Sequence, residues 1–177
     1  YVALGSAALV DGVTIFTGDD QIRRRPAQPL IDALNALGAK VESTRGNGMA
    51  PIIVRGPMRG GEVKIDGSKT SQYLTSLLLN CPLAKGDTII EVENLVERPY
   101  VEMTLSWLAE QGVEVTNDRF ERFTIPGRQQ YRAFDKPIPA DFSSATFFLC
   151  AAAITGSDLT LLGLDMNDTQ GDKAVVD

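Results

Sequence analysis

Histidine is absent from this chain, and cysteine and tryptophan are scarce. The 177 residues include no histidine, two cysteines and one tryptophan. Without imidazole, Ser-His-Asp and Cys-His nucleophilic sites are excluded, as is every metal site that needs a histidine ligand. Any chemistry must therefore use lysine, arginine, carboxylate or hydroxyl side chains.

The two cysteines indicate neither disulfides nor zinc. Cys81 and Cys150 both lie in apolar stretches that we expect to be helical, and no Cys-x-x-Cys spacing occurs. Free cysteine is among the most buried residue types, so we interpret both as buried thiols. Reduced cysteines suit the cytoplasm, where we expect the protein to be located, and we expect no bound metal.

Long hydrophobic runs and a positive net charge are also missing. The longest apolar run, Phe147 to Ile154, is much shorter than the roughly 20 residues of a membrane span. Lys and Arg number 17 against 23 Asp and Glu, and the net charge of −6 repels polyanions on average. We therefore expect neither nucleic acid nor a membrane as a partner, and a local cluster of cations must hold any anionic ligand. The absence of a coiled-coil heptad pattern favours a monomer.

A pattern recurs about every 73 residues along the chain. Arg25-Pro26 returns as Arg98-Pro99, and each pair precedes an amphipathic stretch that ends in glycine, at Gly38 and Gly112. A third copy begins near Gly156. The chain thus contains about two and a half copies of one structural repeat.

Each copy has the same expected order of elements. A helix that is apolar on two faces leads through a glycine turn into a β-branched strand. A second helix follows, opened by proline in its first turn and ended by a left-handed glycine, and short strands complete the copy. We expect helices over 73–83 and 146–154, helices that begin at Pro26 and Pro99, and strands over 13–17, 39–42, 51–55, 61–65, 88–92, 113–116, 120–125 and 135–138. This order favours an α/β fold of tandem βαβαββ units with helices packed under sheets.

The expected linker is the polar segment 128–140, which contains Pro137 and Pro139. We place a domain boundary at its end, so that residues 1–139 form most of a first domain and residues 140–177 begin a second. The helices over 74–83 and 147–154 are apolar almost all round, and we expect both to be covered on most sides.

The first candidate for function is the run Arg23-Arg24-Arg25. A solvated basic loop end would explain it without a ligand. However, Arg25 directly precedes Pro26, where we expect a helix to begin, and a cation is unfavourable near the positive end of a helix dipole. A guanidinium kept there suits binding of a phosphate or carboxylate together with the helix N–H groups. Arg98 occupies the equivalent place in the next copy.

The second candidate is the stretch 66–72, which reads Asp-Gly-Ser-Lys-Thr-Ser-Gln. Helix capping alone would explain one hydroxyl. Thr70, Ser71 and Gln72 in a row, with Lys69 beside them, supply more donors than capping uses. They resemble a cradle for a phosphate or polyol, although the stretch is no P-loop.

A structural role alone could explain three further features of the sequence. Tyr100 suits covering a ligand with its ring and hydroxyl, and equally suits a partly buried core position. Asp141-Phe142-Ser143-Ser144 matches the second candidate in the third copy but lacks its Lys and Gln, so we expect Asp141 to cap a helix. Residues 167–172 have too few spaced oxygens for an EF-hand and are expected to form a polar loop.

At these residues the chain resembles the enolpyruvyl transferases, and among them the EPSP synthase branch. The motifs that carry the resemblance are Thr17-Gly18, Arg25-Pro26, Asp66 to Leu74, Arg98-Pro99-Tyr100, Asp141 to Ala145 and Gln170-Gly171-Asp172. They occur in the family's order over the whole chain. The resemblance implies a two-domain enzyme of six βαβαββ units, of which this chain, beginning without Met, would be an excerpt of about two-fifths.

The resemblance also implies an activity. The family transfers the enolpyruvyl group of phosphoenolpyruvate to the 5-hydroxyl of shikimate 3-phosphate and releases phosphate, a step of the shikimate pathway of aromatic amino acid biosynthesis that needs no metal or other cofactor. The expected partners are these two substrates and the remainder of the two-domain chain, and we expect the excerpt alone to be inactive. Two alternatives remain open: a noncatalytic phosphoester-binding or assembly fragment, and an enolpyruvyl transferase with another acceptor.

The family's binding residues carry over to matching positions only. The substrate-binding candidates are Arg25, Thr70, Ser71, Gln72, Tyr100 and Arg98. By resemblance, Arg25 binds phosphoenolpyruvate and Gln72 touches both substrates. Thr70 and Ser71 match a serine pair that holds shikimate 3-phosphate, and Tyr100 lines the same site. No catalytic residue is assigned, so the chain would contain half a site.

Two positions depart from the family pattern. Glu97 stands where the family has a serine that contacts the shikimate phosphate, and its carboxylate would repel a phosphate unless it turned away or paired with Arg98. Asp20-Gln21-Ile22 stands where the family often has Pro-Arg-Met, which removes one guanidinium.

Overall fold

The computed structural model describes residues 1–176 and divides the chain into two compact units, Tyr1–Arg132 and a second that begins at Ala133. The predicted linker begins at residue 128, but the first unit extends to Arg132. The Tyr131 hydroxyl donates to the Leu79 carbonyl at 2.6 Å, and Gln129 Nε2 donates to the Glu114 carbonyl at 2.9 Å. These bonds hold the start of segment 128–140 on the first unit. The assignment of the units to enzyme domains stays a prediction.

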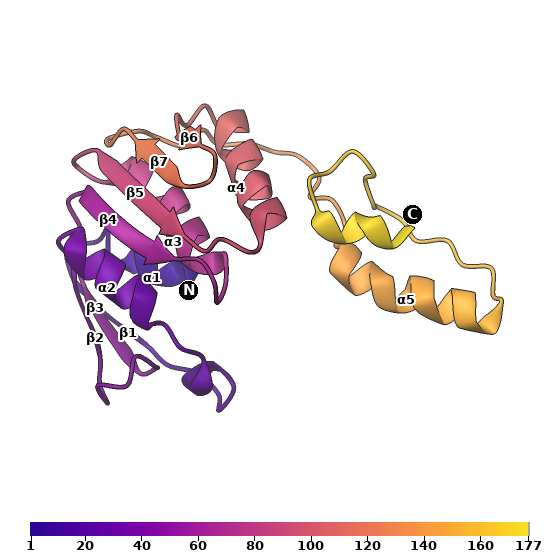
Figure 1. The fold of residues 1–177 in the computed structure, drawn as a ribbon, viewed down its shortest axis with the longest axis horizontal. Helices are drawn as coiled ribbons and strands as arrows, with labels where there is room; N and C mark the ends of the chain where they lie inside the picture. Colours follow the sequence, from indigo (N-terminus) through magenta and orange to yellow (C-terminus); the bar gives the residue numbers. More distant parts are fainter. Residues whose placement is uncertain (177) are drawn as a thin grey trace. The chain divides into compact units, whose positions relative to one another are not determined.

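The first unit contains two sheets (Figure 1). The smaller sheet is antiparallel and has the order β1-β3-β2. The larger has the order β4-β5-β7-β6, in which β4 and β5 are parallel and the other pairs are antiparallel. The strands are β1 (Val13–Phe16), β2 (Lys40–Ser43), β3 (Ile52–Arg55), β4 (Gly61–Asp66), β5 (Thr88–Glu93), β6 (Thr116–Asp118) and β7 (Arg122–Ile125).

The two sheets repeat one arrangement. The order β5-β7-β6 in the second copy reproduces β1-β3-β2 in the first, and the chain from β4 to β7 runs strand, helix, strand, helix, strand, strand. The predicted α/β fold of tandem βαβαββ units is therefore confirmed. Two predicted strands are wrong: β6 begins only at Thr116, and residues 135–138 form no strand. Pro137 and Pro139 offer no N–H to a ladder in that segment.

Four α-helices and two short 3₁₀ turns complete the first unit. They are α1 (Val2–Ala7), η1 (Ile22–Arg24), α2 (Gln28–Ala36), α3 (Gln72–Asn80), η2 (Cys81–Leu83) and α4 (Arg98–Glu110). Helix α3 packs against both α1 and α4, while α2 packs on β4. Gly5 permits the close approach of α1 to α3, because a Cβ there would lie 2.6 Å from Ser76 Oγ.

The first turn of α2 corrects one prediction. The helix begins at Gln28 and has Pro29, not Pro26, in its first turn. Arg25 is extended, with φ −80° and ψ 123°, as expected of a residue that precedes proline. Arg25 is therefore not at the helix N-terminus. In the second copy the prediction is confirmed, because Pro99 lies in the first turn of α4.

Helix α3 lies at the centre of the core. Tyr73, Leu74, Leu77 and Leu78 are all at most 1% exposed. The helix is covered on most sides, as its all-round apolar sequence predicts. The predicted burial of Cys81 at the end of this helix is also confirmed.

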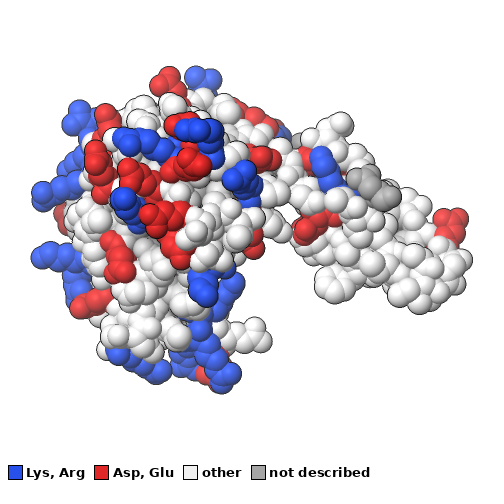
Figure 2. Space-filling view, in the orientation of Figure 1, with Lys and Arg blue, Asp and Glu red and all other residues white. Residues whose placement is uncertain are grey.

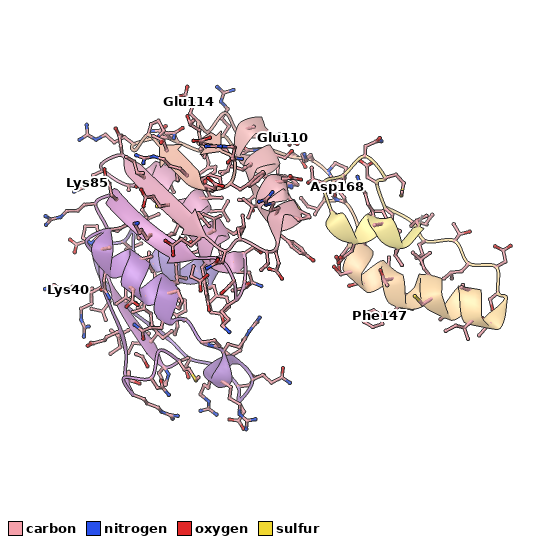
Figure 3. All side chains as sticks on the ribbon, in the orientation of Figure 1. Lys40, Lys85, Glu110, Glu114, Phe147 and Asp168 are labelled. Atoms are coloured by element: carbon pink, nitrogen blue, oxygen red, sulfur yellow. The ribbon has the colours of Figure 1, made fainter. Side chains whose placement is uncertain are left out.

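The second unit consists of α5 (Phe142–Thr155) and η3 (Gly171–Val176), which pack on each other. The Asp141 carboxylate accepts from the backbone N–H groups of Ser143 and Ser144, so the predicted cap is confirmed. The predicted burial of α5 is wrong: Phe147 is 78% exposed and projects from the helix (Figure 3). Cys150 is likewise exposed, contrary to prediction.

Within residues 1–176, no helix combines the length and the apolar character that crossing a membrane requires.

Candidate functional site

The approach to α3 is built by local hydrogen bonds. Asp66, at the end of β4, accepts from the backbone N–H of Ser68 at 3.0 Å and from its hydroxyl at 2.8 Å. These bonds close a turn from Asp66 to Ser68. Thr70 Oγ1 then accepts from the Gln72 N–H at 3.2 Å. The segment predicted as a cradle therefore reaches the N-terminus of α3, with Ser71 as the residue before its first turn.

A cavity of about 420 Å³ lies beside this N-terminus. It is lined by Arg25, Lys69, Thr70, Ser71, Gln72, Thr75, Glu97, Tyr100, Met103 and Thr104. Side chains from three separate segments thus share one cavity, and the beginnings of α3 and α4 both border it. The expected convergence of Arg25 with the stretch from Thr70 to Gln72 is observed, whereas substrate binding by these residues stays a prediction.

The cavity's chemistry suits an anionic or hydroxylated ligand. Arg25 and Lys69 supply positive charge, and the hydroxyl and amide groups supply donors and acceptors. The N-termini of α3 and α4 add the partial positive charge of helix ends. Elsewhere on the first unit, Lys and Arg alternate with Asp and Glu over β4 and β5, whereas basic side chains gather over η1 (Figure 2).

Arg25 is placed in the cavity by a residue of α3. The Tyr73 hydroxyl donates to the carbonyl of Pro26 at 2.7 Å, which ties the segment after Arg25 to the helix. The guanidinium of Arg25 lies 5.4 Å from the centroid of the Tyr1 ring, a cation–π distance. Burial raises the pKa of Tyr73 to about 12, so its hydroxyl stays a donor. No local sequence pattern indicates this positioning role, since Tyr73 fits an apolar helix face.

Arg98 and Tyr100, both from the first turn of α4, have different surroundings. Tyr100 is 40% exposed and lines the cavity, so it is not a core residue. The Arg98 guanidinium lies 5.6 Å from the centroid of the Phe120 ring and is not among the residues that line the cavity. The structure therefore brings Tyr100, but not Arg98, together with the other candidates.

Glu97 is turned toward α3. Its Oε2 accepts from the Ser71 N–H at 3.0 Å and from the Ser71 hydroxyl at 2.9 Å. Of the two arrangements considered for this carboxylate, neither is the one found: it points at the cavity's own donors instead of away from them or at Arg98.

Threonines on facing helices form one wall of the cavity. Thr75 Oγ1 and Thr104 Oγ1 lie 3.3 Å apart, and Thr104 also donates to the Tyr100 carbonyl at 2.9 Å. Sequence reasoning missed both residues. Their positions at one helical turn from Ser71 and Tyr100 are the signal that could have indicated them.

The described residues contain no group of three or more Asp, Glu, Cys or His that could hold a metal ion.

Comparison with known proteins gives the family. A model of the EPSP synthase (3-phosphoshikimate 1-carboxyvinyltransferase) family matches residues 3–177. The 3-phosphoshikimate 1-carboxyvinyltransferase of Ruminiclostridium cellulolyticum is 53% identical over 176 residues, which are 99% of this chain and 42% of that protein. That of Acetivibrio thermocellus is 53% identical over 96% of this chain and 40% of its own length. The chain thus spans about two-fifths of these relatives.

The fold has solved counterparts. EPSP synthase from Acinetobacter baumannii superimposes with a TM-score of 0.72, at 24% identity, over 94% of this chain and 37% of that one. At this identity the likeness concerns the fold alone. Since the family model matches nearly the whole chain, the chain belongs to the EPSP synthase family.

Proposed function

We propose that this chain provides the shikimate 3-phosphate side of an enolpyruvyl transferase active site. The reaction moves the enolpyruvyl group of phosphoenolpyruvate to the 5-hydroxyl of shikimate 3-phosphate and releases phosphate. The relatives' names support this activity, and one observation carries it: Arg25 and the stretch from Thr70 to Gln72 line a single cavity.

The proposed roles follow from position and chemistry. Thr70 and Ser71, at the positive end of α3, bind shikimate 3-phosphate, and Tyr100 lies against the same ligand from α4. Arg25 enters from another segment and binds phosphoenolpyruvate, while Gln72 lies between them and contacts both. Two phosphorylated acids repel each other, so positioned donors and cations are what their approach requires. Arg98, stacked on Phe120, acts on these ligands only through its charge.

The chemistry proceeds by addition and elimination. A proton adds to the methylene carbon of phosphoenolpyruvate, and the 5-hydroxyl oxygen bonds to the adjacent carbon as the hydroxyl proton is lost. Phosphate then leaves, and loss of a methyl proton restores the double bond. Glu97 is the one carboxylate among the residues that line the cavity, and it lies at Ser71, where we expect the phosphate rather than the reacting carbons, so we assign it no proton transfer. We infer that the 177-residue chain binds shikimate 3-phosphate and does not turn it over.

We also infer a cytoplasmic monomer, which the two free cysteines and the absence of a predicted coiled coil support.

Calorimetric titration of shikimate 3-phosphate into the 177-residue chain tests the binding role. Ser71→Ala removes a donor to a charged group and should weaken binding about tenfold. Arg25→Ala removes a cation from the same cavity and should weaken it by a smaller factor. The matched controls are Ser106→Ala and Arg45→Ala, both exposed and outside the cavity lining.

The controls should bind as the unchanged chain does. Binding heat that neither Arg25→Ala nor Ser71→Ala alters would reject the site. Phosphate release from the two substrates by the chain alone would reject the inferred lack of turnover.

A further inference from the structure

Glu97 uses the donors that a bound phosphate would need. Ser71 is 2% exposed, and both its N–H and its hydroxyl point at Glu97 Oε2, at 3.0 and 2.9 Å. The N–H of a residue at a helix start has no partner within the helix. Here a carboxylate oxygen from another element supplies that partner.

The carboxylate does not serve its own helix. Glu97 is the N-cap residue of α4, yet its side chain makes no capping bond to α4. It reaches across to α3 instead, so it lies where the N-termini of both helices favour negative charge. An anion held by a backbone N–H and a serine hydroxyl at a helix start is the usual arrangement of a bound phosphate oxygen.

Little else holds the Glu97 side chain in this position. Among the described residues, its hydrogen bonds are the two from Ser71, and no ion pair to Arg98 is formed. The residue is exposed, and the preceding Val96 is 67% exposed, in the loop between β5 and α4. A rotation of the side chain into solvent therefore frees both donors without moving either helix.

We propose that Glu97 is an intramolecular competitor for the phosphate of the ligand that binds at Ser71. This inference rests on the proposed function, which assigns that ligand as shikimate 3-phosphate. A phosphate cannot share the two donors with a carboxylate of the same sign, so binding requires that Glu97 leave. Glu97 thus sets the affinity of this cavity for phosphorylated ligands and selects against those too weak to displace it.

The test is calorimetric titration of shikimate 3-phosphate into the 177-residue chain and its variants. Glu97→Gln removes the charge and keeps the shape, and Glu97→Ser removes the competitor while retaining a good N-cap residue for α4. Both are expected to bind the ligand about tenfold more tightly, because a hydrogen-bonded charge no longer has to be displaced. Glu102→Gln, an equal charge change at an exposed position of α4, should change affinity less than twofold.

The outcomes separate this proposal from the proposed function. Tighter binding by Glu97→Gln and Glu97→Ser, with Glu102→Gln unchanged, supports competition. If the unchanged chain binds and neither Glu97 variant binds more tightly, competition is overturned and the proposed function stands. If neither the unchanged chain nor any variant binds shikimate 3-phosphate, both the competition and the proposed function are overturned. Loss of folding in both Glu97 variants, measured by thermal unfolding, also overturns competition, since Glu97 would then be a structural cap.

Discussion

Tyr73 shows how a residue outside the cavity lining determines what the lining can do. Its hydroxyl donates to the Pro26 carbonyl, and this bond holds the backbone next to Arg25 in place. Ser71 and Glu97 show the converse, since the carboxylate at position 97 takes up two of the cavity's donors. At this scale the site consists of few groups, each with an identifiable partner.

Tyr73→Phe is expected to lower the free energy of unfolding by about 1 kcal/mol, because the Pro26 carbonyl loses its buried donor. It should also weaken binding of phosphoenolpyruvate, measured with shikimate 3-phosphate present. Tyr131→Phe is the matched control. It loses a bond of similar length to the Leu79 carbonyl from a more exposed side chain, and should cost less stability in urea unfolding without changing ligand affinity. Equal effects of the two variants on affinity would contradict the positioning role.

The two thiols should differ sharply in reactivity. Burial raises the pKa of Cys81 to about 12, so hardly any thiolate forms at neutral pH, whereas Cys150 is exposed. A disulfide reagent added to the folded chain should modify one thiol rapidly and the other only on unfolding. Cys150→Ser should remove the fast phase. A fast phase that persists in that variant would show that Cys81 is accessible.

Among the helices and strands, the N-termini of the helices supply the groups that distinguish one repeat copy from the next. Helix α3 presents Ser71 and Gln72 at the cavity while its other faces form the core, so the site's donors have a rigid support. Helix α5 begins with Ser143-Ser144, which match Thr70-Ser71 in the repeat, and has the carboxylate of Asp141 as its cap. The same repeat position therefore serves a cavity in one copy and helix capping in the next.

Asp141→Ala should lower the temperature at which α5 melts, and circular dichroism measures this melting. Hydrogen bonds from the Ser144 hydroxyl and N–H lower the pKa of Asp141 below its ordinary value of 3.8. A lowered pKa in the folded state means that the stabilisation is present above pH 3.8 and is lost as pH falls through the lowered pKa. The difference between Asp141→Ala and the unchanged chain should thus be full at pH 7 and vanish in acid. Asp158→Ala, exposed after the helix, should show no such difference.

For the whole molecule, the repeat allowed much of the fold to be predicted. The recurrence of Arg-Pro and of a helix-ending glycine anticipated tandem copies with one order of elements along the chain, and Gly38 and Gly112 do adopt positive φ of 95° and 72°. Local patterns failed where tertiary contacts decide. The periodicity of α5 could not show that the described residues leave most of it uncovered, and no local signal joins Glu97 to Ser71.

The separation into units makes a prediction for a shorter chain. Every residue that lines the cavity lies within Tyr1–Arg132. A chain that ends at Arg132 should therefore bind shikimate 3-phosphate as the 177-residue chain does, within about twofold. Brief proteolysis should cut the longer chain between 133 and 140, where neither helix nor strand occurs. Loss of binding on this shortening would place essential contacts beyond Arg132.

A crystal structure of the chain with shikimate 3-phosphate would show whether the phosphate takes the place of Glu97 on Ser71. We expect the phosphate within hydrogen-bond distance of the Ser71 N–H and hydroxyl, with the Glu97 carboxylate turned out to solvent and Arg25 facing the ligand. Ligand bound elsewhere, or a Glu97 carboxylate still on Ser71 with the phosphate bound apart from it, would overturn both the proposed site and the competition.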